Sequence, residues 1–142
     1  TDLLLLVVDS EIQKQYASLI KDITAIDKKR IVSCVSPSGE NAKSYEQFKR
    51  TSDFFLEKEV NRSAHFVAIG GGAISDLCGF VASTMLRGTS WSVIPTTLLS
   101  MVDASIGGKT GINTDFGKNL VGSFHLPSNI FLSLDFLETL PE

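Results

Sequence analysis

Three consecutive glycines, Gly70-Gly71-Gly72, follow a strand-like apolar run and open a helix-like one. Glycines at such a junction let the backbone approach a pyrophosphate, while the N–H groups of the first helical turn offer donors and the positive end of the helix dipole. A tight strand-to-helix turn with unusual dihedral angles is an equal alternative. The spacing departs from the dinucleotide-binding fingerprint, because Ser75 replaces its third Gly or Ala and no acidic residue follows about twenty positions later. Asp9, at the end of the first strand, is placed to supply the ribose-binding acid instead.

A second, glycine-rich segment carries side chains suited to a charged and hydroxylated ligand. Its Gly107-Gly108-Lys109-Thr110 is similar to the end of a Walker A loop, but Asp103 stands where that motif requires its first glycine. A solvated surface loop would explain any one of the charges. Lysines supply point charges for phosphate or carboxylate, and acid and amide groups suit hydroxyls. Together the polar residues favour a phosphorylated polyhydroxy acid held against the backbone; they are Asp103, Lys109, Asn113, Lys118 and Asn119.

Strand and helix patterns alternate in the segments that must position these residues. Apolar runs predict strands at 3–8, 31–35, 65–69 and 91–94. Helical spacing predicts one helix capped by Asp9 or Ser10, a second over about 42–60 and a third over about 73–86. The apolar positions of the first helix are Ile12, Tyr16, Leu19, Ile20 and Ile23, and in the second we expect Tyr45, Phe48, Phe55 and Leu56 to face inward.

This alternation predicts a doubly wound, Rossmann-like α/β layer with a parallel sheet flanked by helices. Ligands of such sheets sit beyond the carboxyl ends of the strands. Asp9, the turn Pro37–Glu40, the triple glycine and Pro95-Thr96-Thr97 all fall at that edge, which is where we expect the site. From 96 to 127 the chain shows little strand pattern, until an apolar run at 130–134.

Composition narrows the function classes. The chain has 142 residues, of which 43% are hydrophobic and 20% charged, typical of a globular protein. Its net charge of −3 argues against nucleic-acid binding, and its longest apolar run, Leu3–Val8, is too short to span a membrane. Cys34 and Cys78 lack CxxC spacing and are expected as buried reduced thiols, so we expect a cytoplasmic protein. The two histidines lie far apart, and no metal site can be assembled from this chain.

From the triple glycine onward the chain resembles the 3-dehydroquinate synthase family. The motifs match in order and spacing: Gly70-Gly71-Gly72-Ala73-Ile74-Ser75-Asp76-Leu77, Arg87-Gly88, Pro95-Thr96-Thr97-Leu98-Leu99, Val102-Asp103-Ala104-Ser105, Gly107-Gly108-Lys109-Thr110-Gly111-Ile112-Asn113, Gly117-Lys118-Asn119 and Leu134-Asp135-Phe136-Leu137-Glu138-Thr139-Leu140-Pro141. Upstream, Pro37-Ser38-Gly39-Glu40 with Lys43 is similar to the family's nucleotide-contacting turn.

The resemblance implies a phosphate-eliminating lyase of the shikimate pathway, which leads to the aromatic amino acids. Its substrate would be 3-deoxy-D-arabino-heptulosonate 7-phosphate, and its products 3-dehydroquinate and phosphate. NAD would oxidise one hydroxyl, phosphate would leave, the ketone would be reduced again, and an aldol step would close the ring. NAD would thus act catalytically, with a zinc or cobalt ion polarising the oxidised carbon's oxygen. The resemblance also implies a homodimer.

The resemblance further implies roles for individual residues. The catalytic and substrate-binding group would be Asp103, Lys109, Lys118 and Asn119, with Arg87 reaching a phosphate in the partner subunit. The NAD site would be formed by Asp9, Ser38, Gly39, Glu40, Lys43, Gly71, Gly72, Ala73, Ile74, Ser75, Asp76, Thr96, Thr97, Lys109, Lys118, Phe136, Leu137, Glu138 and Thr139. Two positions depart from the family pattern: Ser75 replaces a usual glycine, and Glu11 stands where an asparagine often follows the first strand.

The same resemblance places the metal ligands, a glutamate and two histidines, after Pro141-Glu142. We therefore expect residues 1–142 to be the NAD-binding α/β domain of a longer enzyme that continues into a helical metal-binding domain. One alternative is another sugar-phosphate cyclase, acting on a hexose or heptose phosphate. Lys109 argues against it, because the carboxylate of the heptulosonate needs a cation. The other alternative is a non-catalytic nucleotide-binding module or a relative of iron-type alcohol dehydrogenases.

Overall fold

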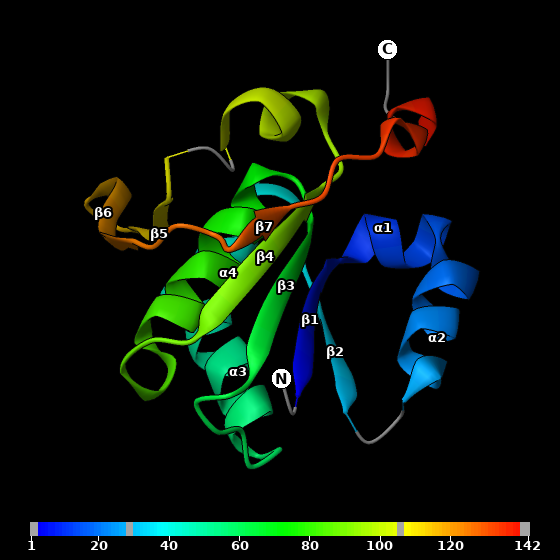
Figure 1. Cartoon of the computed structure of the whole chain (residues 1–142). Coiled ribbons are helices and arrows are strands. Elements are labelled where there is room, and N and C mark those ends of the chain that lie inside the picture. Colours follow the sequence, from blue (N-terminus) through cyan, green and yellow to red (C-terminus); the bar gives the residue numbers. More distant parts are fainter. Residues whose placement is uncertain (1–2, 28–29, 105–106, 140–142) are drawn as a thin grey trace.

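The computed structural model describes residues 3–27, 30–104 and 107–139, which form an α/β layer around one parallel sheet (Figure 1). The sheet has five strands in the order β2-β1-β3-β4-β7, all paired in parallel. This confirms the predicted fold class. The strands are β1 (Leu4–Asp9), β2 (Ile31–Ser36), β3 (His65–Gly70), β4 (Ser90–Pro95) and β7 (Asn129–Ile130).

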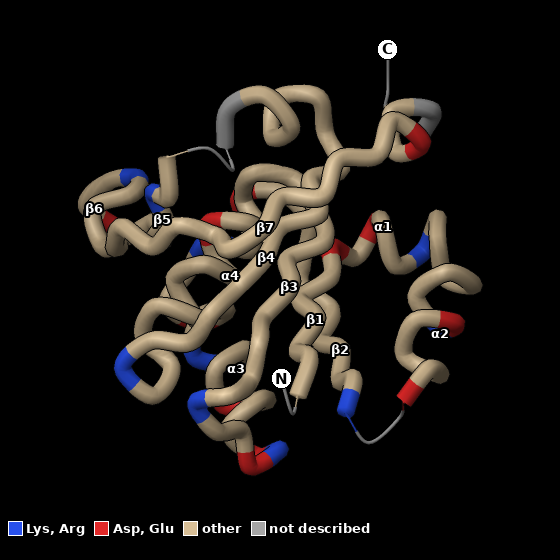
Figure 2. The backbone as a smooth tube through the Cα atoms, in the orientation of Figure 1, with Lys and Arg blue, Asp and Glu red and all other residues tan. Residues whose placement is uncertain are grey.

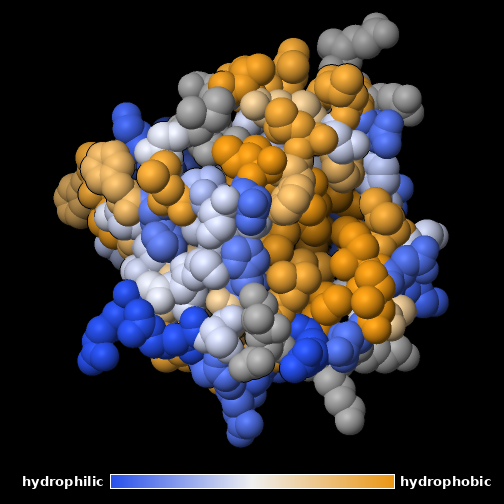
Figure 3. Space-filling model, in the orientation of Figure 1, coloured by the Kyte–Doolittle hydropathy of each residue, from blue (hydrophilic) through white to orange (hydrophobic). Residues whose placement is uncertain are grey.

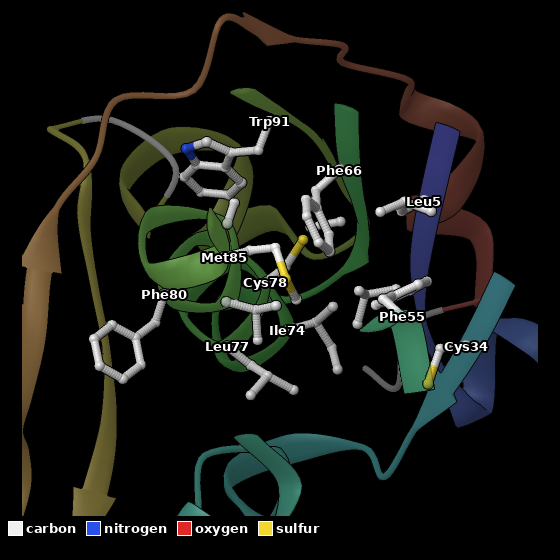
Figure 4. Close-up of a cluster of buried hydrophobic side chains, with 14 of the residues drawn as sticks. Leu5, Cys34, Phe55, Phe66, Ile74, Leu77, Cys78, Phe80, Met85 and Trp91 are labelled. Carbon is white, nitrogen blue, oxygen red and sulfur yellow. The ribbon is translucent and has the colours of Figure 1, made fainter. Parts of the chain in front are cut away.

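Helices cover both faces of the sheet. On one face lie α3 (Tyr45–Leu56) and α4 (Gly72–Thr84), and on the other, beside β1 and β2, lie α1 (Ser10–Gln15) and α2 (Ala17–Ile26) (Figure 1). Neighbouring strand residues point to opposite faces, so Leu5 joins Phe55 of α3 and Leu77 of α4 in the larger core cluster (Figure 4). Leu6 points the other way and packs with Ile20 of α2. Cys34 and Cys78 are buried and free, as expected.

The face of the sheet that carries α2 is covered only in part. A hollow of about 340 Å³ is lined there by alternate residues of β1, β3 and β4, among them Leu6, Val67 and Ile94, together with Ile23 and Phe131. Figure 3 shows the apolar surface on this side of the molecule. No helix in the described part of the chain is long and apolar enough to cross a membrane.

The helices differ from their predicted bounds in ways that packing explains. The first helix breaks at Tyr16 (φ −124°, ψ 34°), whose ring packs edge-on against the Phe136 ring with 5.0 Å between the centroids. After this break Leu19, one of the apolar positions of the predicted helix, is 46% exposed. The second begins only after its N-cap Ser44. Its residues Tyr45 and Leu56 are 57% and 49% exposed, contrary to prediction, because the buried stripe follows the spacing of residues 48, 51 and 55.

The chain differs from prediction at three further places. The third helix, predicted to about residue 86, ends at Thr84, and Arg87 lies in the 3-10 turn that follows, exposed and at φ 68°. Between residues 96 and 127, where little strand structure was expected, an antiparallel hairpin pairs β5 (Lys109–Thr114) with β6 (Gly117–Phe124). The apolar run at 130–134 is strand only as far as Ile130, and a 3-10 helix, Leu134–Thr139, follows.

The two strands of the hairpin lie close together at positions that carry no side chain. A Cβ on Gly122 would overlap the carbonyl oxygen of Thr110, and one on Gly111 would lie 2.8 Å from the carbonyl oxygen of Val121. The Thr110 hydroxyl bonds to the Ser123 hydroxyl at 2.8 Å, and Ser123 in turn donates to Ser83 of α4 at 2.7 Å. The hairpin is thus fixed to the helix that follows the triple glycine.

Candidate functional site

A cavity of about 1020 Å³ opens at the edge where the parallel strands end. Charged residues of both signs gather along this edge and on the nearby hairpin (Figure 2). Most of the residues expected at the nucleotide line this one cavity: Asp9, Ser38, Gly39, Glu40, Lys43, Gly71, Gly72, Ala73, Ile74, Asp76, Thr96 and Thr97. They come from the segments that follow β1, β2, β3 and β4, so the parallel topology is what brings them together.

Asp9 connects the first two of these segments. Its Oδ1 accepts hydrogen bonds from the backbone N–H of Glu11 at 2.7 Å and of Ile12 at 3.4 Å, which caps α1. Its Oδ2 accepts from the Ser38 hydroxyl at 2.9 Å. An ionised carboxylate has about four lone-pair sites, so Asp9 can serve as cap and still accept a ligand hydroxyl.

The triple glycine keeps the floor of the cavity close to the backbone. A Cβ on Gly70 would lie 2.7 Å from Ile74 and 3.0 Å from Asp9, and one on Gly71 would lie 3.2 Å from Thr97. Gly71 is the N-cap of α4 and offers no side-chain cap, which leaves the first N–H groups of a 13-residue helix for a ligand.

Ser75, which was expected at the nucleotide, is buried behind the glycine turn and does not line the cavity. It is 1% exposed, and its hydroxyl donates to the Gly71 carbonyl oxygen at 3.3 Å. The serine therefore fits behind the glycine turn, and its departure from the family pattern leaves the cavity lining intact.

A buried ion pair stands between the cavity and the hairpin. The Lys43 ammonium donates to Asp76 Oδ2 at 2.8 Å and also to Asn119 Oδ1. Lys43 is only 4% exposed. Burial raises the pKa of Asp76, while the hydrogen bond and charge of Lys43 act to lower it. Two opposite charges thus occupy a largely buried position next to the nucleotide-sized cavity.

A smaller pocket of about 340 Å³ adjoins this pair. It is lined by Lys109 and Thr110 of β5, by Asp76, and by Asn119 with neighbouring residues of β6. Asp76 and Asn119 line both the pocket and the larger cavity. The structure therefore brings together Lys109 and Asn119, two of the residues expected at the substrate.

Other expected site residues lie elsewhere. Lys118 and Arg87 are exposed and line neither space, and Lys109 lines only the smaller pocket. Phe136 is buried against Tyr16, and Leu137 packs on the same apolar cluster. The side chains of Asp103, Glu138 and Thr139 fall outside the described residues, although the backbone at 103 belongs to a π-helical turn, Ser100–Ala104, and that at 138 and 139 to the 3-10 helix Leu134–Thr139.

Four residues that the sequence did not assign to either ligand also line the cavity: Glu11, Ile12, Gln15 and Leu99. Three of them follow Asp9 on one side of α1, at spacings that place helical residues on a common face. That spacing was a usable signal, since α1 starts at the same sheet edge as the glycine turn.

Metal ligands are a separate question. Within residues 3–27, 30–104 and 107–139, no three His, Cys, Asp or Glu side chains lie close enough to hold a metal ion.

Sequence comparison shows what this chain is similar to. A family model described as 3-dehydroquinate synthase N-terminal matches residues 33–142. The 3-dehydroquinate synthase of Staphylococcus epidermidis is 48% identical over 132 residues, which cover 92% of this chain and 37% of that protein. The chain therefore spans little more than a third of this relative's length.

Two solved structures share the fold. The 2-epi-5-epi-valiolone synthase of Streptomyces hygroscopicus, with NAD+ and Zn2+ bound, has a TM-score of 0.85 and 32% identity, covering 98% of this chain and 39% of its own. A 2-deoxy-scyllo-inosose synthase complexed with carbaglucose-6-phosphate, NAD+ and Co2+ has a TM-score of 0.83 and 26% identity, covering 99% and 39%. Since each match covers almost the whole chain, the likeness includes both the sheet and the hairpin.

Proposed function

The chain belongs to the 3-dehydroquinate synthase family, and from that premise we propose that it forms the NAD site and part of the substrate site of a longer enzyme. The enzyme would convert 3-deoxy-D-arabino-heptulosonate 7-phosphate into 3-dehydroquinate and phosphate, acting as a homodimer in the shikimate pathway. One observation carries the proposal: the nucleotide-sized cavity and the Lys109 pocket share Asp76 and Asn119 as common walls. A substrate in the smaller pocket would therefore touch a nucleotide in the larger one.

The cavity fits a dinucleotide in size and in chemistry. Its volume, about 1020 Å³, is at the upper end of the range for small-molecule sites. Gly71 and Gly72 line the cavity without side chains, and the N-terminus of α4 can receive a pyrophosphate. Asp9 and Ser38 can bond to ribose hydroxyls. When bound, NAD would take a hydride from a substrate hydroxyl carbon and later return it.

The chain's own residues would bind and orient the substrate beside that nucleotide. Lys109 would place a positive charge against the substrate's anionic groups, and Asn119 would bond to an oxygen next to it. The Lys43–Asp76 pair would hold the boundary between the two ligands in place. The described residues do not fit a metal site, so zinc or cobalt would be held by other residues of the longer enzyme.

Phosphate release from the complete enzyme tests this function. With heptulosonate phosphate, NAD and zinc, we expect sustained phosphate release with no net NADH, because the nucleotide is reoxidised in each cycle. The isolated chain should not sustain turnover, since no three His, Cys, Asp or Glu side chains of its described residues lie together to hold the metal ion.

The competing functions give different results in the same assay. Stoichiometric NADH would indicate a dehydrogenase. Turnover of a hexose phosphate in preference to the heptulosonate would indicate another sugar-phosphate cyclase, and nucleotide binding without turnover of either would indicate a binding module. Each of these outcomes would overturn the proposed reaction.

A further inference from the structure

Lys43 connects three segments that are far apart in the sequence. It follows the 3-10 turn Gly39–Ala42, and its ammonium bonds to Asp76 of α4 and to Asn119 of β6. Its backbone oxygen also accepts from the N–H of Asn113 in β5 at 2.7 Å. A buried ammonium is costly unless it is paired and hydrogen-bonded, so the positions of these partners are strongly constrained by Lys43.

The Lys43 contact fixes which way the Asn119 carboxamide faces. An ammonium can only donate hydrogen bonds, so the atom that faces it must be the carboxamide oxygen. The NH2 group of Asn119 then faces away from Lys43, on a residue that is exposed and lines the Lys109 pocket. A carboxamide held in this way directs its two N–H donors away from Lys43, at a residue that lines both the Lys109 pocket and the larger cavity.

A second amide fixes the backbone of Asn119 in the same manner. Asn113 Nδ2 donates to Glu40 Oε2 at 2.7 Å, since a carboxylate can only accept. Asn113 Oδ1 is thereby left to accept from the Asn119 backbone N–H at 3.2 Å. Asn119 has a positive φ of 60°, which asparagine tolerates better than most residues. The side chain of Asn119 is thus bonded directly to Lys43, and its backbone is connected through Asn113 to Glu40, in the turn after β2.

We propose that Lys43 is a positioning residue for the substrate pocket, which holds Asn119 so that its NH2 group donates to an oxygen of the bound substrate beside Lys109. This inference rests on the proposed function, because it takes the Lys109 pocket to be the substrate site. This role is compatible with a contact between Lys43 and the nucleotide. An ammonium has three donors, and Asp76 and Asn119 use two of them. It also makes the pocket specific for an acceptor oxygen at that point.

Steady-state phosphate release at saturating NAD tests the connection between Lys43 and Asn119. Lys43→Met keeps most of the side-chain stem and removes the ammonium. We expect kcat/KM for the substrate to fall at least tenfold in Lys43→Met and in Asn119→Ala, and the double variant to be no worse than the poorer single variant. Fold losses that multiply in the double variant, or a Lys43→Met defect confined to NAD affinity, would overturn the proposal. Lys49→Met, at an exposed lysine of α3, is the matched control and should behave like the wild type.

A second variant tests the donor role without removing the buried lysine. Asn119→Asp keeps an acceptor for Lys43 but has no NH2 group, so kcat/KM should fall as far as in Asn119→Ala. Activity like that of the wild type in Asn119→Asp would show that no donor is needed there. This comparison remains decisive even if Lys43→Met does not fold.

Side-chain NMR separates a failure of this inference from a failure of the proposed function. If the wild-type enzyme releases no phosphate, the reaction is wrong, but the contact can still be measured. The Asn119 NH2 resonances should shift in Lys43→Met and stay unchanged in Lys49→Met. Resonances that are the same in both variants would show that Lys43 does not hold the carboxamide.

Discussion

Gly79 of α4 packs against Thr110 of the hairpin, and Gly79→Ala tests whether that close packing positions the substrate pocket. A Cβ at residue 79 would overlap the γ-methyl of Thr110 and lie 2.8 Å from two carbons of the Trp91 ring. Neither neighbour can move readily, because Trp91 is 2% exposed and the Thr110 hydroxyl is bonded to Ser123. β5 must therefore shift away from the helix, and Lys109, adjacent to Thr110, must shift with it.

Two opposing effects determine how much Gly79→Ala changes the free energy of unfolding. Overpacking costs about 1–3 kcal/mol, and contact with two constrained neighbours places this site near 3 kcal/mol. Alanine in place of glycine within a helix stabilises by about 1 kcal/mol. The net destabilisation is about 2 kcal/mol, which lowers the melting temperature by about 6 °C in a domain of this length and by less in the longer enzyme.

Thermal unfolding, NAD affinity and phosphate release measure the three consequences in the complete enzyme. In Gly79→Ala we expect the lower melting temperature and a kcat/KM reduced on the order of 10–100-fold, the scale of an ångström-sized misplacement. NAD affinity should be retained, because Gly79 lies beyond the helical residues that line the cavity. Adding Thr110→Ser removes the overlapping methyl and should restore part of both losses. Thr84→Ala, at an exposed site of α4, is the control; stability and kcat/KM in Gly79→Ala equal to the control would refute the reasoning.

Further predictions concern charged groups. Lys109→Ala should lose roughly 3 kcal/mol of transition-state stabilisation with little change in NAD affinity; a variant that loses NAD binding and keeps its substrate KM would contradict this. If Arg87 acts across a dimer, Arg87→Ala subunits mixed with Lys109→Ala subunits should regain activity, and heterodimers no more active than the separate variants would exclude it. Burial lowers the pKa of His65, which is bonded to Ser90 and Ser92. The unfolded chain therefore binds more protons, and stability should fall as pH falls through about 6.5; urea unfolding at several pH values should show this loss in the wild type and a smaller one in His65→Gln.

The sequence predicted the sheet, and the edge at which the large cavity lies, because the signals for them are local. The strand at 65–69 is a short apolar run bounded by a loop and by glycines, and parallel strands gather their carboxyl ends at one edge. The hairpin was missed because Gly111 and Gly122 replace the side chains whose alternation marks a strand. Side chains are excluded at these positions because Gly111 lies against Val121 and Gly122 against Thr110. Only the folded chain shows these contacts.

Contacts between distant residues account for the remaining differences. The helix break at Tyr16 accompanies its packing on Phe136, far along the chain. The Lys43–Asn119 bond joins residues 76 positions apart. The family resemblance assigned these two residues to different ligands, and in the structure both line the larger cavity. Periodicity cannot report such a pairing, because it describes neighbours along one element and not between elements.

The cavity walls come from chain segments as far apart as Asp9 and Asn119, so a nucleotide that fills it acts as a noncovalent cross-link across most of the fold. A ligand that binds only the folded state raises the free energy of unfolding by RT ln(1 + [L]/Kd), about 2.7 kcal/mol at a hundredfold excess over Kd. Amide exchange and proteolysis at the turns after β1, β2, β3 and β4 should then slow together when NAD is added. The lifetime of the protein in a cell would accordingly follow the supply of its cofactor.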